Sequence, residues 1–259
     1  MTSLSSILEP DRVLLFVLVL ARCGGLIAMA PIFGDALVPG AVRALFAGTL
    51  AVVLLPLAPP VAKPMAGLPG LAAAAVVEVA IGLAMGYVAR LALLVFEMAG
   101  EVVSIQMGLG IASLIDPMEA FRSTVLGRWY WMVGATLFLA LDGHHYVIRA
   151  LAASLELVPP GRGTLGGDAA AELSSFAAAG VGRALAIGAP AVGILLATSL
   201  GLGLLARAVP QMNVFLVGMP IQIAAGILAV AATTPFLIEV GRHEMVDLAT
   251  RLTALLHAF

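Results

Sequence analysis

The sequence predicts an all-α integral membrane protein with about six hydrophobic helical segments, one of them interrupted. Of its 259 residues, 62% are hydrophobic and only 11% are charged, whereas soluble domains have about 45–50% apolar and roughly 25% charged residues. So few charges cannot cover a soluble globule of this size, which excludes a free cytosolic enzyme. The high hydrophobicity excludes a disordered chain. A formal charge of −2 with one lysine, Lys63, excludes a basic nucleic-acid-binding surface.

Five apolar segments have about the length of a membrane span. A helix needs about 20 consecutive apolar residues to cross a hydrocarbon core of ~30 Å. The third segment is set apart from the second by a stretch rich in proline and glycine, 59–70, which breaks helical structure. We therefore expect separate helices over 13–33, 41–58, 71–96, 181–206 and 214–238.

The region 129–157 predicts one interrupted helix or two half-helices. Its apolar part stops at Leu141, too early to span alone, and is followed by Asp142, Gly143, His144 and His145. Polar groups and broken backbone survive at membrane depth only where protein or water satisfies them. This region is the interrupted sixth segment.

The N-terminal segment is expected to remain in the mature protein. A signal peptide needs a basic n-region, and residues 1–10 contain only Glu9 as a charged side chain. The single cysteine, Cys23, lies in this apolar run and is expected to be a small buried hydrophobic residue.

Ionisable residues inside the apolar runs are the first candidates for function. Each costs about 2.5–3.5 kcal/mol in a membrane segment on insertion scales, so each needs a partner or water. The like-charged pair Glu97 and Glu101 stands four residues apart, which suits water or a cationic partner and not lipid. Alternatively, the pair marks the solvated end of the third helix. The candidates are Arg22, Glu78, Arg90, Glu97 and Glu101.

The stretch after Glu101 is the most unusual in the chain. It reads VVSIQMGLGIASLIDPMEAFRS, with glycines at 108 and 110, a lone Gln106, and a turn signal at Asp116-Pro117. Its glycine spacing disfavours a stable isolated helix. Apolar backbone of this kind fits a re-entrant loop, a gate or a plug. The alternative is a plain connecting loop with an amphipathic start.

Small residues recur at spacings that allow helices to approach closely. Gly82 and Gly86 form a GxxxG pattern in the third segment, and Gly201 and Gly203 lie in the fifth. Such glycines pack helices within a chain or between subunits. In a chain so rich in glycine and alanine, chance is a serious alternative.

No pattern in the sequence indicates an enzyme, a cofactor or a metal. Adjacent histidines such as His144 and His145 point to different faces of a helix and lack the i, i+4 spacing of a metal pair. A structural or interfacial pair is favoured over a metal site or proton relay. The sequence contains no Gly-rich phosphate loop, GxSxG or SxxK motif.

Four stretches resemble the FliR family of flagellar biosynthetic proteins, the R-type export-gate subunits of type III secretion systems. They are RCGGLIAMAPIFG (22–34), EVAIGLAMGYVARLALLVFEMAGEVVSIQMGLGIASLIDP (78–117), LFLALDGHH (137–145) and LLARAVPQMNVFLVGMPIQIAAGILAV (204–230). The match covers nearly the whole chain. Its most specific parts are Gln106-Met107-Gly108 ahead of Asp116-Pro117, and Arg207 with 210–213. One departure is Asp142, where the family pattern has asparagine.

The resemblance implies a membrane subunit of the flagellar protein export gate, part of the channel for unfolded rod, hook and filament proteins. It implies P-type and Q-type partners (FliP and FliQ), a B-type switch subunit (FlhB), an A-type subunit (FlhA), and a place in the bacterial inner membrane at the flagellar basal body. Residues 1–180 would be a P-like part and 181–259 a Q-like helical hairpin. Helical hairpins would pack within a hetero-oligomer.

The resemblance and the polar pattern together nominate two sets of site residues. The segment 106–122 would form a plug, with Gln106, Met107, Gly108, Gly110, Asp116, Pro117 and Arg122. Subunit packing or buried polar contacts would involve Arg22, Glu78, Gly82, Gly86, Arg90, Glu97, Glu101, Arg207, Pro210, Gln211 and Asn213. The alternatives are the equivalent subunit of a virulence injectisome, a secondary solute transporter, or an intramembrane enzyme using Asp142, His144 and His145.

Overall fold

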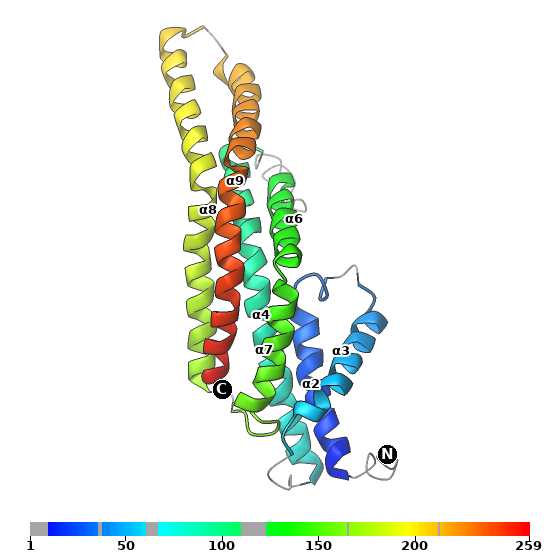
Figure 1. Ribbon diagram of the computed structural model, residues 1–259. Coiled ribbons are helices and arrows are strands. Elements are labelled where there is room, and N and C mark those ends of the chain that lie inside the picture. The colour runs from blue at the N-terminus through cyan, green and yellow to red at the C-terminus, as the bar shows by residue number, and fades with distance from the viewer. Residues whose placement is uncertain (1–9, 36–37, 61–66, 110–122, 165, 212) are drawn as a thin grey trace. The chain divides into compact units, whose positions relative to one another are not determined.

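The computed structural model describes residues 10–35, 38–60, 67–109, 123–164, 166–211 and 213–259. Within these ranges the chain forms helices, turns and no strand (Figure 1). The all-α membrane architecture is confirmed, because five described helices are long and apolar enough to cross a membrane. The elements in chain order are α2 (Pro10–Met29), α3 (Gly40–Leu54), the 3₁₀ turn η1 (Leu55–Leu57), α4 (Gly67–Gln106), α6 (Val125–Ala140), α7 (Gly143–Leu157), α8 (Gly167–Ala208) and α9 (Val214–His257).

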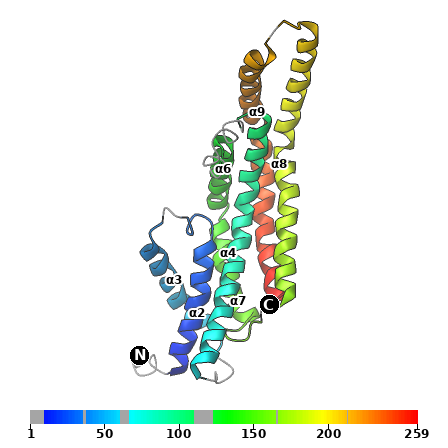
Figure 2. The same ribbon diagram turned by 180° about the vertical axis from the view of Figure 1, so that it is seen from behind.

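The helices pack into two compact units that interleave along the sequence. Unit 1 consists of Met1–Leu91, Asp142–Ala177 and Val246–Phe259, and unit 2 of Ala92–Leu141 and Ala178–Met245. In unit 1, α2 and α3 lie side by side as a hairpin (Figures 1 and 2). In unit 2, α8 and α9 run beside one another on either side of a short turn. The predicted division at residue 180 into a P-like and a Q-like part stays a prediction.

Local chemistry explains where several helices begin and end. Thr124 begins α6 by accepting a hydrogen bond from the Gly127 amide (3.1 Å), and Asn213 begins α9 by accepting one from the Leu216 amide (3.2 Å). Both are typical N-cap contacts. The interruption between α6 and α7 lies at Asp142, whose backbone is left-handed (φ 58°, ψ 27°). The predicted interrupted segment is therefore two half-helices.

Three helices are much longer than the apolar runs that predicted them. The third segment was expected to end at Phe96, but α4 continues to Gln106 and so includes the first residues of the stretch expected to be a loop. Likewise, α8 begins at Gly167 and α9 continues to His257. Prolines 190, 220 and 235 lie inside α8 and α9, as is tolerated in membrane helices whose freed backbone groups find other partners.

Candidate functional site

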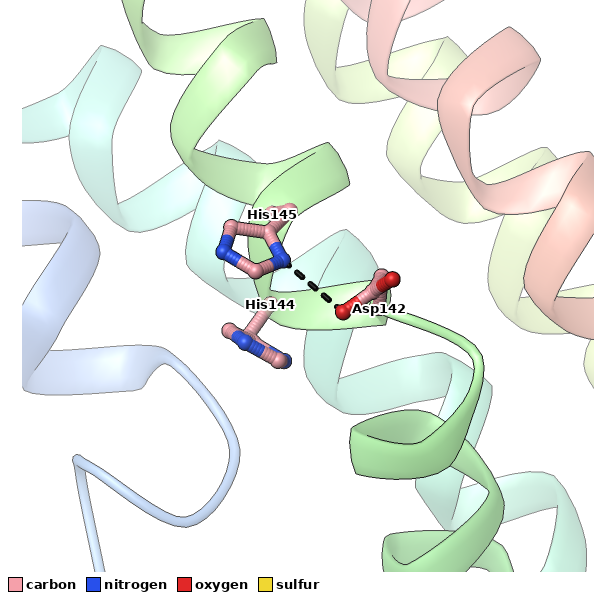
Figure 3. A group of neighbouring side chains, drawn as sticks. All are labelled: Asp142, His144 and His145. Atoms are coloured by element: carbon pink, nitrogen blue, oxygen red, sulfur yellow. Dashed lines mark hydrogen bonds and ion pairs between the residues drawn. The ribbon is translucent and has the colours of Figure 1, made fainter.

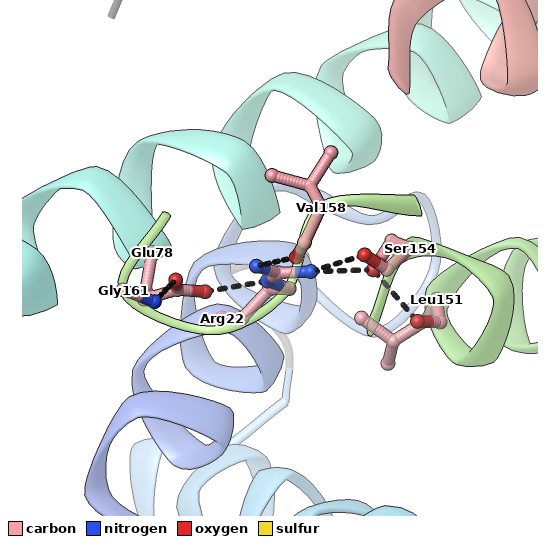
Figure 4. A network of polar contacts seen from close by, with 6 residues as sticks. All are labelled: Arg22, Glu78, Leu151, Ser154, Val158 and Gly161. Carbon is pink, nitrogen blue, oxygen red and sulfur yellow. Dashed lines mark hydrogen bonds and ion pairs between the residues drawn. The ribbon is translucent and has the colours of Figure 1, made fainter. Parts of the chain in front are cut away.

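Two of the predicted intramembrane charges form a buried ion pair in unit 1. Arg22 of α2 and Glu78 of α4 are both 0% exposed, and Arg22 Nε donates to Glu78 Oε2 at 2.6 Å (Figure 4). The other guanidinium nitrogens donate to the carbonyl oxygens of Ser154 (2.7 Å) and Val158 (2.8 Å). The Gly161 amide donates to Glu78 Oε1 at 2.9 Å.

This network joins α2, α4 and the end of α7. Arg22 also donates to the Ser154 hydroxyl (3.0 Å), which in turn donates to the Leu151 carbonyl (2.7 Å). Both charges and both carboxylate oxygens therefore have partners, which is the condition for burying an ion pair without a large desolvation penalty. The network leaves neither charge open to a ligand, so its role is to hold these segments together.

The glycines at 82 and 86 lie in the contact between α4 and α2. A β-carbon at Gly82 would overlap the carbonyl oxygen of Arg22, and one at Gly86 would stand 2.7 Å from the carbonyl oxygen of Leu26. From the other side, a β-carbon at Gly25 of α2 would overlap the carbonyl oxygen of Val79. The two backbones therefore touch directly, as in close helix packing between small residues.

A Schellman motif ends α4 at the start of the predicted plug. The Leu109 amide donates to the Ser104 carbonyl (3.1 Å), and the Gly108 amide donates to the Ile105 carbonyl (3.0 Å). Gly108 has φ +82°, a left-handed conformation that glycine adopts without a side-chain penalty. Gly108 is predicted to give the backbone conformational freedom, and in the structure it uses this freedom to end α4.

The last turn of α4 packs against α9 within unit 2. The Gln222 amide nitrogen donates to the Gln106 carbonyl at 3.0 Å. The Met107 side chain is 2% exposed and lies against Gly226, where a β-carbon would overlap its Cγ and Sδ atoms. The other nominated plug residues, Gly110, Asp116, Pro117 and Arg122, lie outside the described residues.

Glu101 connects α4 to the beginning of α6. Its Oε1 accepts a hydrogen bond from the Thr124 amide at 2.7 Å. A carboxylate at a helix N-terminus also interacts favourably with the helix dipole. Glu101 is expected to face water or a cationic partner, and the partner it has is the N-terminus of α6. This carboxylate therefore does not mark a solvated helix end.

The remaining nominated residues have other surroundings. Arg90 is exposed and Glu97 is half-buried, and neither has an ion pair among the described residues. Arg207 lies in the last turn of α8, where its charge suits the helix dipole. The residues nominated around the turn into α9 are all exposed: Arg207, Pro210, Gln211 and Asn213.

Asp142, His144 and His145 lie together in unit 1 at the start of α7 (Figure 3). Their donor atoms are within 4.8 Å of one another, and His145 Nδ1 hydrogen-bonds Asp142 Oδ1 at 2.9 Å. The two rings lie with centroids 4.1 Å apart, although adjacent residues on a helix were expected to diverge. One carboxylate and two imidazoles are donors that divalent transition metals accept, yet two of the three are already bonded to each other.

Several residues that make these contacts were not predicted from the sequence. Gln222 is the only polar side chain between Asn213 and Thr233, so the rule that singled out Gln106 would have found it. Gly25 carries the same small-residue signal as Gly82. The contacts of Ser154, Val158 and Gly161 with the buried charges leave no local signal, because backbone groups provide most of them.

Comparison with known proteins identifies the family. The family model described as "Bacterial export proteins, family 1" matches residues 13–248. Flagellar biosynthetic protein FliR of Caulobacter vibrioides is 32% identical over 237 residues, covering 90% of this chain and 94% of the relative. FliR of Escherichia coli is 31% identical and covers 86% of this chain and 85% of its own.

A more distant relative carries a different name. The surface presentation of antigens protein SpaR of Shigella flexneri is 24% identical over 176 residues, with 64% of this chain and 67% of the relative covered. The resemblance predicted from the motifs is confirmed by the FliR relatives, which match over most of their length. The chain therefore belongs to the bacterial export protein family, family 1.

Proposed function

We propose that this chain is a membrane subunit of the flagellar type III protein export gate and forms part of the channel for unfolded rod, hook and filament proteins. The observation that carries this proposal is similarity to flagellar relatives over more than four-fifths of both chains. The match to SpaR is weaker and shorter, which favours the flagellar role over that of an injectisome subunit.

The lengths of the helices support assembly with other subunits. Helices α4, α8 and α9 contain 40, 42 and 44 residues, or about 60–66 Å at 1.5 Å per residue. A hydrocarbon core is only ~30 Å thick, and the usual tilt of about 20° does not absorb the difference. Large apolar side chains remain exposed on these helices outside the predicted spans, including Leu68, Ile105 and Val246. Other proteins, P-type and Q-type subunits in this proposal, would cover what lipid cannot.

We further propose that the segment 106–122 is the plug of this gate. Both flanks of the segment are fastened to unit 2: Gln106 and Met107 contact α9, and Thr124 is bonded to Glu101 of α4. A plug must occlude one defined place, which fixed ends make possible. A plain connecting loop does not need its ends to be held in this way. The inner membrane and the B-type and A-type partners belong to the same proposal.

Co-purification and conductance test these proposals separately. We expect the tagged chain, extracted gently from native membranes, to carry P-type and Q-type subunits at a defined particle mass. A pure monomer or homo-oligomer would contradict the export-gate role and favour a transporter. In the assembled complex, deletion of residues 107–116 should increase ion conductance in planar bilayers, whereas deletion of residues 61–66 should not. Equal conductance of the 107–116 deletion and the intact complex would refute the plug.

A further inference from the structure

Gln222 is a buried polar side chain in the apolar first part of α9. It is 8% exposed, and its amide nitrogen lies within hydrogen-bonding distance of three acceptors on two other helices. These are the Gln106 carbonyl of α4 (3.0 Å), and the Leu195 carbonyl (3.2 Å) and the Ser199 hydroxyl (3.0 Å) of α8. All of these groups belong to unit 2. A lone amide in an apolar helix is costly unless such partners satisfy it.

Gly226 lies one turn further along the same face of α9. Residues four apart on a helix are neighbours, so Gln222 and Gly226 present one continuous surface to the end of α4. The Met107 side chain occupies the space that a side chain at 226 would need. Gln222 thus hydrogen-bonds Gln106, and the next residue of the chain, Met107, fits against Gly226.

We propose that Gln222 and Gly226 form an anchor that sets the position of the last turn of α4, from which the segment after it departs. The anchor holds the chain at the two residues before the helix-terminating Gly108. Only the consequence of this anchor for export rests on the proposed plug. The anchor itself concerns contacts within unit 2 alone.

The hydrogen bonding of Gln222 is complete at its amide nitrogen and incomplete at its oxygen. Three acceptors compete for the two N–H groups of the Gln222 amide, while its Oε1 has no hydrogen-bond partner among the described residues. Ser104 Oγ, two residues before Gln106, has none there either. Buried polar atoms without partners raise the free energy of the folded arrangement. The anchored arrangement is therefore less tightly held than a fully satisfied network such as that of Arg22.

A disulfide tests whether the anchor exists. Because Met107 Cγ lies where a Gly226 side chain would begin, the pair M107C and G226C brings two Cβ atoms into the disulfide range of about 3.5–4.5 Å. Mild oxidation of the assembled complex should link them. The control pair M107C and I227C should stay reduced, since Ile227 is 59% exposed on another face. No link at 226, or an equal link at 227, would overturn the proposal.

The role of Gln222 is tested in the same background. Q222M keeps an unbranched side chain of similar length and removes the amide, so we expect the rate of the 107–226 link to fall by about fivefold or more. T136V, at an exposed threonine of α6 outside the anchor, should leave the rate within about twofold. If Q222M prevents assembly, S199A still tests the mechanism: with two acceptors left to the amide, the rate should stay within about threefold. An unchanged rate in Q222M, or a loss in S199A as large as that expected of Q222M, would refute the hydrogen-bonded anchor.

Conductance separates the anchor from the plug. If both proposals hold, G226A, which pushes against Met107, should increase ion leakage through the complex. G193A, at a position where a β-carbon meets nothing within 4 Å, should not. A 107–226 link that behaves as expected, together with no leak in G226A or in the plug deletion, would keep the anchor and reject the plug.

Discussion

At the scale of single residues, the interior of unit 1 depends on charges whose partners are distant in sequence. Arg22 meets Glu78 across 56 positions and Ser154 across 132. The composition of the chain predicts that such charges need partners, but the partners themselves follow only from the packing of three helices. Removing one member leaves the other buried in a medium that stabilises charge poorly.

We expect R22A to lower the free energy of unfolding by about 3–5 kcal/mol, because Glu78 stays buried without its partner. The double variant R22M and E78L should recover at least half of that loss, since it removes both charges. Thermal unfolding in detergent, followed by circular dichroism, measures both. A double variant no more stable than R22A would show that the backbone contacts of Arg22 matter more than its charge pairing.

The resemblance predicts asparagine where this chain has Asp142, and the conformation of Asp142 explains why either residue is suitable. The backbone is left-handed there, a region that asparagine and aspartate enter more readily than other non-glycine residues. We expect D142N to change stability by no more than about 0.5 kcal/mol, because the contact with His145 is between exposed side chains. D142V should cost about 1–2 kcal/mol. The same unfolding measurement distinguishes them, and a stable D142V would contradict the backbone explanation.

The Asp142, His144 and His145 cluster is expected to hold no stoichiometric metal. The side chains of Asp142 and His145 are 69% and 54% exposed and bonded to each other, so a metal ion would have to displace that bond. Elemental analysis of the purified protein after dialysis measures this directly. One retained equivalent of zinc would instead establish a metal site and reopen the enzyme alternative.

At the scale of the helices, small residues decide which elements touch. The adjacent glycines 24 and 25 offer a matched comparison, because a β-carbon at Gly25 overlaps α4 and one at Gly24 meets nothing within 4 Å. Helix propensity favours alanine at both positions by about 0.5–1 kcal/mol. A comparison of alanine at the two positions therefore separates the effect of α2–α4 packing on stability from the effect of helix propensity.

We expect G25A to destabilise the chain by about 1–3 kcal/mol through overpacking. G24A should be neutral or stabilising by up to about 1 kcal/mol. Comparing the unfolding temperatures of the two variants in one detergent cancels the effect of propensity. Equal behaviour of both variants would mean that α2 and α4 are not in backbone contact.

Most helices could be predicted from apolar runs, but their lengths could not. The run that predicted α4 stops before Glu97, because Glu97 and Glu101 follow as a like-charged pair. The helix continues since Glu101 has a partner at Thr124, and it ends before Gly108, whose backbone is left-handed. In α9, charged residues recur among apolar ones beyond Ile238, with Glu239 pairing to Arg242 three residues on. The candidate plug was likewise found by composition, while its anchor at Gln222 required knowledge of which helices meet.

At the scale of the whole molecule, long apolar helices exceed what one bilayer can cover. We expect the isolated chain to aggregate in lipid nanodiscs, which cover only ~30 Å of helix. In detergent, which adapts to exposed apolar surface, the chain should stay dispersed, and co-expression with P-type and Q-type subunits should restore behaviour in nanodiscs. Size-exclusion chromatography with light scattering measures this. A monodisperse isolated chain in nanodiscs would contradict the need for partners.

The complete burial of Cys23 gives the protein a chemical reporter of its own unfolding. The thiol is 0% exposed and is the only one in the chain, directly after the arginine of the buried network. A maleimide should therefore label the native chain slowly and the opened chain quickly, so the labelling rate counts excursions of α2 away from its neighbours. Without an engineered cysteine, the loosening of unit 1 becomes measurable in intact membranes while the export complex is in use.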